Sequence, residues 1–157
     1  MKILMVCLGN ICRSPLAEGI LKQKVKEAGL NWIIESAGTN GFHVGESPHP
    51  SSCKVASMKG IDISSQIARQ FTKDDFKRYD RIYAMAGDVI REMKDISGKY
   101  YDEQKVKLLL EEIKPGEDLD VPDPWYGRED GYYPVFDLIE EACTAILQNH
   151  LKEMENE

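Results

Sequence analysis

The stretch Lys2-Ile-Leu-Met-Val-Cys-Leu-Gly-Asn-Ile-Cys-Arg-Ser-Pro15 decides the fold of this chain. Residues 2–7 are apolar and continuous, which is typical of a short strand buried on both faces in a parallel sheet. Leu8, Gly9 and Asn10 interrupt that strand. Ser14 and Pro15 then begin a helix, with a hydroxyl near the cap and a proline in the first turn. The stretch therefore predicts a strand, a tight loop and a helix in direct succession.

The same alternation continues along the rest of the chain. We expect further strands over residues 32–36, 81–85 and 106–110. We expect helices over residues 14–28, 50–59, 73–78, 88–94 and 134–154. Strands that alternate with helices predict a parallel sheet covered by helices on both faces. Since ligands bind beyond the carboxyl ends of the strands in such sheets, the loop after residue 7 is the expected binding site.

Length and composition fit one compact domain. The chain has 157 residues, of which 42% are hydrophobic and 30% are charged. We therefore expect residues 1–157 to form a single domain with its own core. The net charge of -7 argues against nucleic-acid binding and mildly against docking on anionic membrane, although backbone dipoles can still bind an anion. We expect no signal peptide and no insertion into a membrane.

The cysteines bear on metals and on the cellular compartment. Cys7, Cys12, Cys53 and Cys143 form no C-x-x-C pair, and no histidine lies at metal-ligand spacing from them. We therefore expect no metal, no cofactor and no disulfide framework, and we expect a cytoplasmic protein. Cys53 and Cys143 lie on apolar faces of expected helices, where they should be inert core residues.

Residues 7–14, Cys-Leu-Gly-Asn-Ile-Cys-Arg-Ser, predict a loop that binds phosphate; we call it the Cys7 loop. A loop that wraps onto a helix N-terminus directs several N–H groups at one point, which favours an anion with several oxygens. Gly9 allows a close backbone approach, and Asn10 tolerates a left-handed conformation. Arg13 can grip two phosphate oxygens at once. The alternative is that Cys7 is only a buried cysteine at a strand end and Arg13 only a surface arginine. The strand before the loop and the helix start after it make this alternative less favourable.

Cys7 is the expected nucleophile. The field of the loop should stabilise a thiolate there, because cysteines at helix N-termini and beside arginine ionise readily. A thiolate beneath a bound phosphate can attack phosphorus, and the Ser14 hydroxyl can donate to the sulfur. The leaving oxygen then needs a proton, for which Asp123 in a proline-stiffened loop is the candidate. Three neighbouring residues have similar claims from chemistry alone: Asp118, Asp120 and Asp130.

Four motifs together resemble the low-molecular-weight protein tyrosine phosphatases. They are Cys7-Leu-Gly-Asn-Ile-Cys-Arg-Ser-Pro15, Ser36-Ala-Gly-Thr39, Ala68-Arg-Gln70 and Asp123-Pro-Trp-Tyr-Gly127. They follow the family's order and spacing over essentially the whole chain, and the first and last are highly specific. The resemblance implies an α/β, flavodoxin-like three-layer sandwich with a four-stranded parallel sheet and helices on both faces. It also implies metal-free hydrolysis of phosphotyrosine in the cytoplasm.

The resemblance also implies a role for each matching residue. Cys7 is the nucleophile that forms a phosphocysteine, Arg13 clamps the phosphoryl group, and Asp123 is the general acid and then the base. The phosphate-binding residues are Leu8, Gly9, Asn10, Ile11, Cys12 and Ser14, with support from Ser36. The expected substrate walls are Phe42 on one side and Trp125 and Tyr126 on the other. Phosphate, sulfate or vanadate should bind in the loop, and bacterial relatives are often paired with a tyrosine kinase.

The resemblance also implies a redox role for Cys12. Relatives with both thiols form a reversible disulfide that protects the nucleophile, so Cys12 is the expected redox partner of Cys7. The alternative is that Cys12 only packs or lends a backbone N–H.

Relatives often carry His where this chain has Gln66, and Asp where it has Ala86. We expect these changes to alter loop rigidity or pH dependence and to leave the reaction class unchanged.

Three rival functions stay open. An arsenate reductase would need further cysteines after the third strand, and the sequence offers none there. Phosphoarginine phosphatases resemble this loop but carry Thr where this chain has Ile11, whose apolar side chain suits a phenyl ring better. A catalytically silent phosphate-binding module would not need Cys7, Arg13 and Asp123 together. Of the histidines, only His43 lies in a loop expected to face the site.

Overall fold

The structure, a computed structural model, describes residues 1–156 apart from the side chain of Tyr126. The strands are β1 (Lys2–Cys7), β2 (Ile33–Gly38), β3 (Arg81–Ala84) and β4 (Val106–Leu108). They form one four-stranded sheet in the order β2-β1-β3-β4. All three strand pairs are parallel, so the carboxyl ends of the strands meet at one edge. The expected four-stranded parallel sheet is therefore confirmed.

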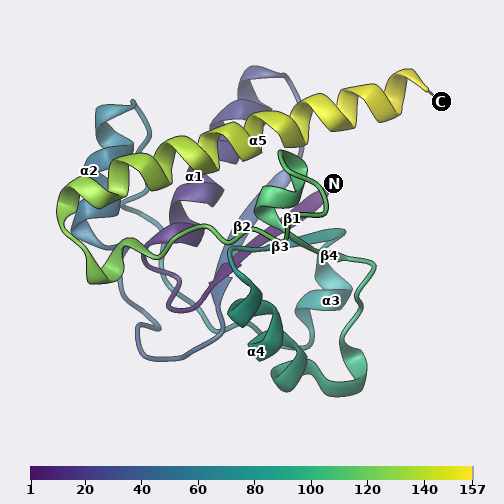
Figure 1. Ribbon diagram of the computed structural model, residues 1–157, viewed down its shortest axis with the longest axis horizontal. Helices are drawn as coiled ribbons and strands as arrows, with labels where there is room; N and C mark the ends of the chain where they lie inside the picture. The colour runs from purple at the N-terminus through teal and green to yellow at the C-terminus, as the bar shows by residue number, and fades with distance from the viewer. Residues whose placement is uncertain (157) are drawn as a thin grey trace.

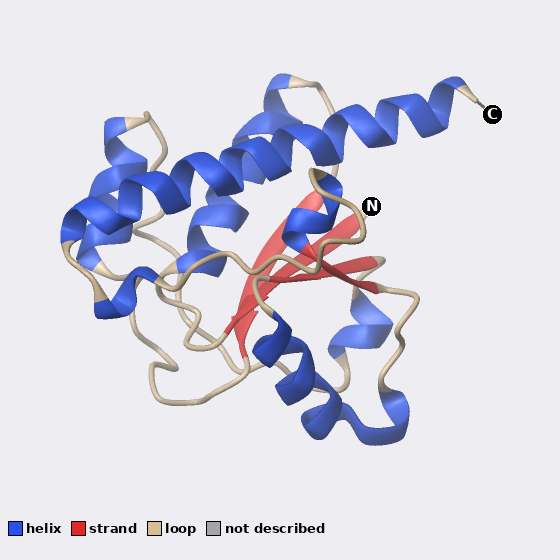
Figure 2. Cartoon of the chain, in the orientation of Figure 1, coloured by secondary structure: helices blue, strands red, loops and turns tan. Residues whose placement is uncertain are grey.

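Helices cover both faces of this sheet. They are α1 (Arg13–Glu27), α2 (Pro50–Met58), α3 (Asp75–Arg78), α4 (Gly87–Ser97) and α5 (Tyr132–Glu155). Short 3₁₀ turns are η1 (Gly98–Tyr100), η2 (Leu109–Glu112), η3 (Pro124–Tyr126) and η4 (Glu129–Gly131). Figures 1 and 2 show α1, α2 and α5 on one face and α3 and α4 on the other, which is the expected three-layer sandwich. No helix in the described part of the chain is long and apolar enough to span a membrane.

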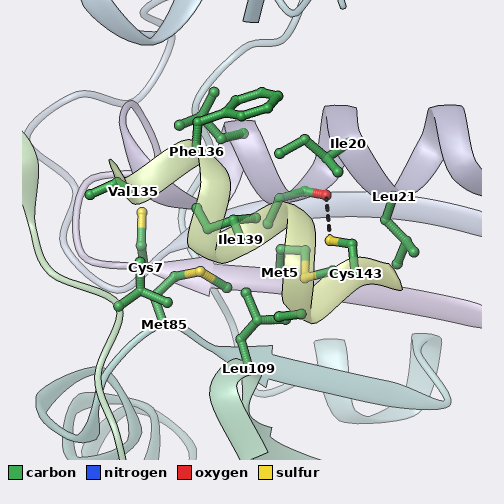
Figure 3. Packing of buried hydrophobic residues seen from close by; sticks show 14 of the residues in the cluster. Met5, Cys7, Ile20, Leu21, Met85, Leu109, Val135, Phe136, Ile139 and Cys143 are labelled. Atoms are coloured by element: carbon green, nitrogen blue, oxygen red, sulfur yellow. Dashed lines mark hydrogen bonds between the residues drawn. The ribbon is translucent and has the colours of Figure 1, made fainter. Parts of the chain in front are cut away.

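Two hydrophobic clusters fill the spaces between the layers. Ile3 and Met5 of β1 belong to the cluster beneath α1 and α5, while Leu4 and Val6 belong to the cluster beneath α4. Successive strand residues point to opposite faces, so a central strand between two helical layers must be apolar at every position. Figure 3 shows side chains of α1, α5 and the sheet interleaved in the first cluster, with Cys7 at its edge.

The expected elements are all present, but several boundaries differ for local reasons. β2 runs on to Gly38, because Cys7 and Gly38 are paired residues of the β1–β2 ladder. α3 begins only at Asp75, since the Asp75 carboxylate accepts a hydrogen bond from the Thr72 N–H at 2.9 Å and closes a turn before the helix. α5 begins two residues before Pro134, because a proline is tolerated in the first turn of a helix.

Candidate active site

The Cys7 loop joins the carboxyl end of β1 to the first turn of α1. Asn10 has a φ of 58°, the left-handed conformation expected for it. The loop is tied to the segment after β2, because the N–H groups of Thr39 and Asn40 donate to the carbonyls of Cys7 and Leu8 at 3.0 and 2.9 Å. A Cβ at Gly9 would lie 3.0 Å from Cδ2 of His43, so the close approach at Gly9 is made by the loop that carries His43.

The Cys7 sulfur lies at the base of this loop and is buried. It accepts a hydrogen bond from the Asn10 N–H at 3.3 Å and lies 2.9 Å from the Ser14 hydroxyl. Among the residues that the structure describes, no protein acceptor is found for the N–H groups of Gly9, Ile11 and Cys12. These free donors lie just before the N-terminus of α1, an arrangement that can bind an anion with several oxygens.

Arg13 and Asp123 lie together beside the loop. The Arg13 guanidinium is buried, with Nη1 donating to the carbonyl of Val121 at 3.0 Å and Nη2 lying 3.6 Å from Oδ2 of Asp123. The other Asp123 oxygen accepts from the Trp125 N–H at 3.0 Å. The Val121 N–H donates to the carbonyl of Met85 at 2.7 Å, which fixes the Asp123 loop to the end of β3. Segments more than 100 residues apart thus meet at one point.

The structure separates Asp123 from the neighbouring aspartates. In the described part of the chain, Asp123 is the one of these four that lines the cavity over the Cys7 loop. Asp120 accepts from the Gly87 N–H at 2.9 Å and so caps α4. Asp118 adopts a φ of 51° in a turn, and Asp130 lies in η4. Position in the cavity therefore makes Asp123 the candidate proton donor among the four aspartates.

A cavity of about 400 Å³ opens over the loop. Its lining residues are Cys7, Leu8, Gly9, Ile11, Cys12, Arg13, Asn40, Phe42, His43, Asp123 and Trp125. Phe42 is 85% exposed and Trp125 44% exposed, so both offer free aromatic surface at its mouth. The cavity size suits a small ligand or one side chain. The side chain of Tyr126, the remaining expected wall, lies outside the described residues.

The side chains of Asn10 and Ser14, which the resemblance placed among the phosphate-binding residues, do not line the cavity, and neither does that of Ser36. The side-chain amide of Asn10 donates to the hydroxyl of Ser14 at 2.8 Å and to that of Ser36 at 3.0 Å. Its carbonyl oxygen accepts from the Arg69 N–H at 3.0 Å. The three side chains therefore form one buried hydrogen-bonded network beneath Cys7.

Comparison with known proteins places this geometry in a family. The family model described as "Low molecular weight phosphotyrosine protein phosphatase" matches residues 2–157. The chain belongs to this family of phosphatases. A putative low molecular weight protein-tyrosine-phosphatase of Synechocystis is 41% identical to this chain. The match covers 99% of this chain and 100% of that relative.

Solved structures of similar phosphatases share the whole fold. The protein tyrosine phosphatase of Entamoeba histolytica, crystallised with Hepes in its active site, superposes with a TM-score of 0.87 and 36% identity over 99% of both chains. The arginine phosphatase YwlE of Bacillus subtilis, solved as a Cys-to-Ser mutant with a phosphorylated active-site serine, has a TM-score of 0.88. It is 29% identical to this chain over 100% of both.

The two departures from the family pattern are explained by local contacts. Gln66 donates from Nε2 to the carbonyl of Pro15 at 3.1 Å, so it braces the first turn of α1 and makes no bond to Asn10. Ala86 is buried and occupies the N-cap of α4, where it provides no side-chain cap. Asp120 from the Asp123 loop satisfies the N–H of Gly87 instead.

Cys12 lines the phosphatase cavity as a buried thiol. Burial is the largest cause that raises the pKa of Cys12, to about 11; a hydrogen bond with Tyr132 lowers it, and the neighbouring Cys7 and Asp123 raise it by smaller amounts. Cys12 is therefore a neutral thiol at physiological pH. Cys143 is fully buried as expected, whereas Cys53 on α2 is only half-buried.

Two residues of the phosphatase site had not been expected from the sequence. Glu18 is a buried carboxylate that accepts from the Ser36 hydroxyl at 2.6 Å. Its one signal is its position four residues after Ser14, on the same face of α1. His49 packs on Trp125 and Tyr132, with ring centroids 5.3 and 5.4 Å away. The sequence carries no pattern that indicates this contact.

Proposed function

We propose that this protein hydrolyses phosphotyrosine on proteins through a phosphocysteine formed on Cys7. The observation that carries the proposal is the meeting of Cys7, Arg13 and Asp123 in one cavity lined by free N–H groups. A nucleophile, an anion clamp and a proton donor are the parts that this reaction needs. Membership in a phosphatase family gives independent support. We further propose that residues 1–157 form a single phosphatase domain.

In the first step, the Cys7 thiolate attacks phosphorus. The S–P bond forms while the bond between phosphorus and the tyrosine oxygen breaks, and Asp123 gives its proton to that oxygen. The N–H groups of the loop and the guanidinium of Arg13 stabilise the charge on the transferring phosphoryl oxygens. In the free protein Arg13 is paired with Asp123, so a bound phosphate would compete for the guanidinium and release the carboxyl group.

In the second step, water attacks the phosphocysteine. Asp123, now a carboxylate, takes a proton from the water as its oxygen bonds to phosphorus, and the S–P bond breaks to give inorganic phosphate. The departing sulfur carries negative charge, which a hydrogen bond from Ser14 stabilises. Both steps use only water, side chains and the backbone N–H groups of the Cys7 loop.

The shape of the cavity favours a phenyl phosphate. Cys7 lies at the base, so a long side chain is needed to carry phosphate down to it. Ile11 presents an apolar side, and Phe42 and Trp125 offer aromatic surface to the ring at the mouth. Phosphoarginine is the second candidate, because the YwlE arginine phosphatase has the same fold. The apolar Ile11 favours tyrosine between the two.

A redox role for Cys12 and a cytoplasmic location complete the proposal. Cys7 and Cys12 are both free thiols that line the same cavity, so oxidation of Cys7 would leave a second thiol close by. We propose that Cys12 then forms a disulfide with Cys7. The reducing cytoplasm would return the pair to thiols.

A substrate panel tests the proposal. The reduced protein should hydrolyse phosphotyrosine peptides, and p-nitrophenyl phosphate, far faster than phosphoserine or phosphoarginine peptides, and a chelator should change none of these rates. Cys7→Ser should abolish turnover, while Cys53→Ser, a matched change outside the cavity, should leave it intact. Preference for phosphoarginine would establish the second candidate, and turnover by Cys7→Ser would refute the assignment of the nucleophile.

A further inference from the structure

Glu18 is a buried carboxylate that the proposed reaction does not use. It lies on α1 with only 6% of its surface exposed, and glutamates are almost never buried to this degree unless they are paired. Lys22, one turn further along α1, donates to Oε2 at 2.5 Å. The Ser36 hydroxyl, from β2, donates to Oε1 at 2.6 Å. The side chain thus joins the solvent-facing Lys22 to the network beneath Cys7.

The direction of each hydrogen bond in this network can be derived from its two ends. At one end, the backbone N–H of Arg69 can only donate, so the oxygen of the Asn10 amide must face it. The Asn10 nitrogen must then face Ser14 and Ser36 and give one hydrogen to each hydroxyl oxygen. An amide that faced the other way would set donor against donor at Arg69.

At the other end, the Glu18 carboxylate can only accept. Lys22 donates to Oε2, and the single hydrogen of Ser36 points to Oε1. The oxygen of Ser36 is then free to accept from Asn10. Without an acceptor at position 18, the Ser36 hydroxyl could rotate its hydrogen toward Asn10 and push the amide away.

We propose that Glu18 is a positioning residue for the phosphatase reaction. By taking the hydrogen of Ser36, it holds the Asn10 amide in the orientation that donates to the oxygen of Ser14. The hydrogen of Ser14 is then left for the Cys7 sulfur, 2.9 Å away. Four hydrogen bonds in series connect the carboxylate to the nucleophile. This inference rests on the proposed role of Cys7 and extends the loop's support beyond Ser36.

Other charged groups near the nucleophile come from different elements. Arg13 on α1, Asp123 in the loop before α5 and His43 in the loop after β2 line the cavity with Cys12. Lys22 is the cation that faces Glu18 itself. A carboxylate that acted only through its charge would, when removed, leave Lys22 unopposed and favour the Cys7 thiolate. The series of hydrogen bonds predicts the opposite change. Loss of the acceptor at position 18 weakens the hydrogen bond from Ser14 to the Cys7 sulfur and so disfavours the thiolate.

Glu18→Met and Glu18→Gln separate these two effects. Both remove the charge, but only Gln keeps an oxygen that can accept from Ser36. The readout is the pH midpoint for inactivation of Cys7 by iodoacetate. For Glu18→Met we expect a midpoint about 0.5–1 unit higher and kcat about 3–10-fold lower, the size of one neutral hydrogen bond. Glu18→Gln should stay near the wild-type protein in both measurements.

A second pair of variants keeps the test decisive if Glu18→Met is poorly folded. Ser36→Ala, which leaves Glu18 in place, should reproduce the shift by itself, and Glu18→Gln should add nothing to it in that background. Glu112→Met, which removes another buried carboxylate, should leave the midpoint unchanged. Equal behaviour of Met and Gln at position 18, or a lowered midpoint, would overturn the proposal. The iodoacetate profile does not need turnover, so its result stands apart from failure of the proposed phosphotyrosine hydrolysis.

Discussion

Two buried carboxylates make an instructive comparison. Glu112 lies on the α5 side of the molecule, and Glu18 lies beneath the candidate active site. Glu112, in the turn after β4, accepts from the hydroxyl of Tyr83 at 2.9 Å and from the amide of Asn149 on α5 at 2.7 Å. Glu18 also accepts from a hydroxyl, and each has a lysine partner. The difference is where the bonds lead: those of Glu112 end in the scaffold, whereas those of Glu18 continue to the Cys7 sulfur. The continuation of a polar network, rather than burial, distinguishes support of a site from support of a fold.

The environment of Glu112 shows its structural role. Burial alone would raise the pKa of Glu112, but hydrogen bonds from Asn149 and Tyr83, with the charge of Lys107, bring it below its usual value. The native state therefore stabilises the ionised carboxylate. Because the partners lie on β3, β4 and α5, these bonds hold the last helix against the edge of the sheet.

After the complete loss of turnover expected for Cys7→Ser, Asp123→Asn should give the largest effect, and this effect should be confined to activity. Loss of a general acid typically costs about 10²- to 10⁴-fold in rate. We expect a loss of this size on substrates with poor leaving groups and a much smaller loss on p-nitrophenyl phosphate, whose leaving group needs little protonation. Initial rates on both substrates check this. An equal loss on both would point to a different acid, for which Asp120→Asn is the matched control.

Glu112→Gln should do the reverse and lower stability without changing kcat. Its bonds are charge-assisted, so we expect a loss of about 1–3 kcal/mol in the free energy of unfolding at neutral pH. The folded-state pKa is lowered, so the contribution is complete above the unfolded value of 4.5 and is lost as the pH falls through the folded value. Urea unfolding at pH 7 and at pH 3.5 should show the gap between the variant and the wild-type protein narrowing in acid. A gap that is independent of pH would contradict the ionic account.

The sequence predicted the layers and the reacting groups because both depend on local signals. The unbroken apolar run of β1 indicates a strand buried on both faces, and the Cys7 loop combines a strand end, a turn and a helix start. Residues 106–110 were misread in part: the apolar run fits a strand, yet Leu109 and Leu110 turn into η2 and fill the cluster under α5. An apolar run alone does not distinguish a strand from a buried turn.

Glu18 and His49 could not be predicted because their roles depend on partners from other elements. Glu18 is one of 27 acidic residues, and its function follows from contact with Ser36, 18 residues away. His49, at the N-cap of α2, contacts Trp125 from a segment 76 residues further along the chain. Asp123 was singled out among its neighbours by the family resemblance, and its place in the cavity gives the physical reason.

The next largest expected effect is the pH dependence of disulfide formation between Cys7 and Cys12. It concerns the active site alone and does not involve the scaffold around Glu112. Peroxide converts the Cys7 thiolate to a sulfenic acid, and Cys12 must then attack as a thiolate, so that the S–S bond forms while the S–O bond breaks and hydroxide leaves. Since burial raises the pKa of Cys12 to about 11, its thiolate fraction should rise about tenfold per pH unit below that value. Mass spectrometry after brief peroxide treatment should therefore show disulfide gaining on sulfinic acid between pH 6 and 8. A constant ratio, or sulfinic acid at Cys7 with no disulfide, would contradict it.

The smallest expected effect is at the rim, where a side chain can serve the substrate without serving the fold. Phe42 is 85% exposed, so its ring contributes little to the core, yet it lines the cavity. Contact with one face of a phenyl ring in a water-filled site is worth about 0.5–1.5 kcal/mol, so Phe42→Ala should raise KM for phosphotyrosine peptides about 2- to 10-fold. The free energy of unfolding and kcat should stay unchanged, because neither the scaffold network of Glu112 nor the chain from Glu18 to Cys7 includes Phe42. Ile67→Ala, a change of an exposed apolar residue that does not line the cavity, is the matched control. A fall in kcat with constant KM would show instead that the rim acts on the reacting groups.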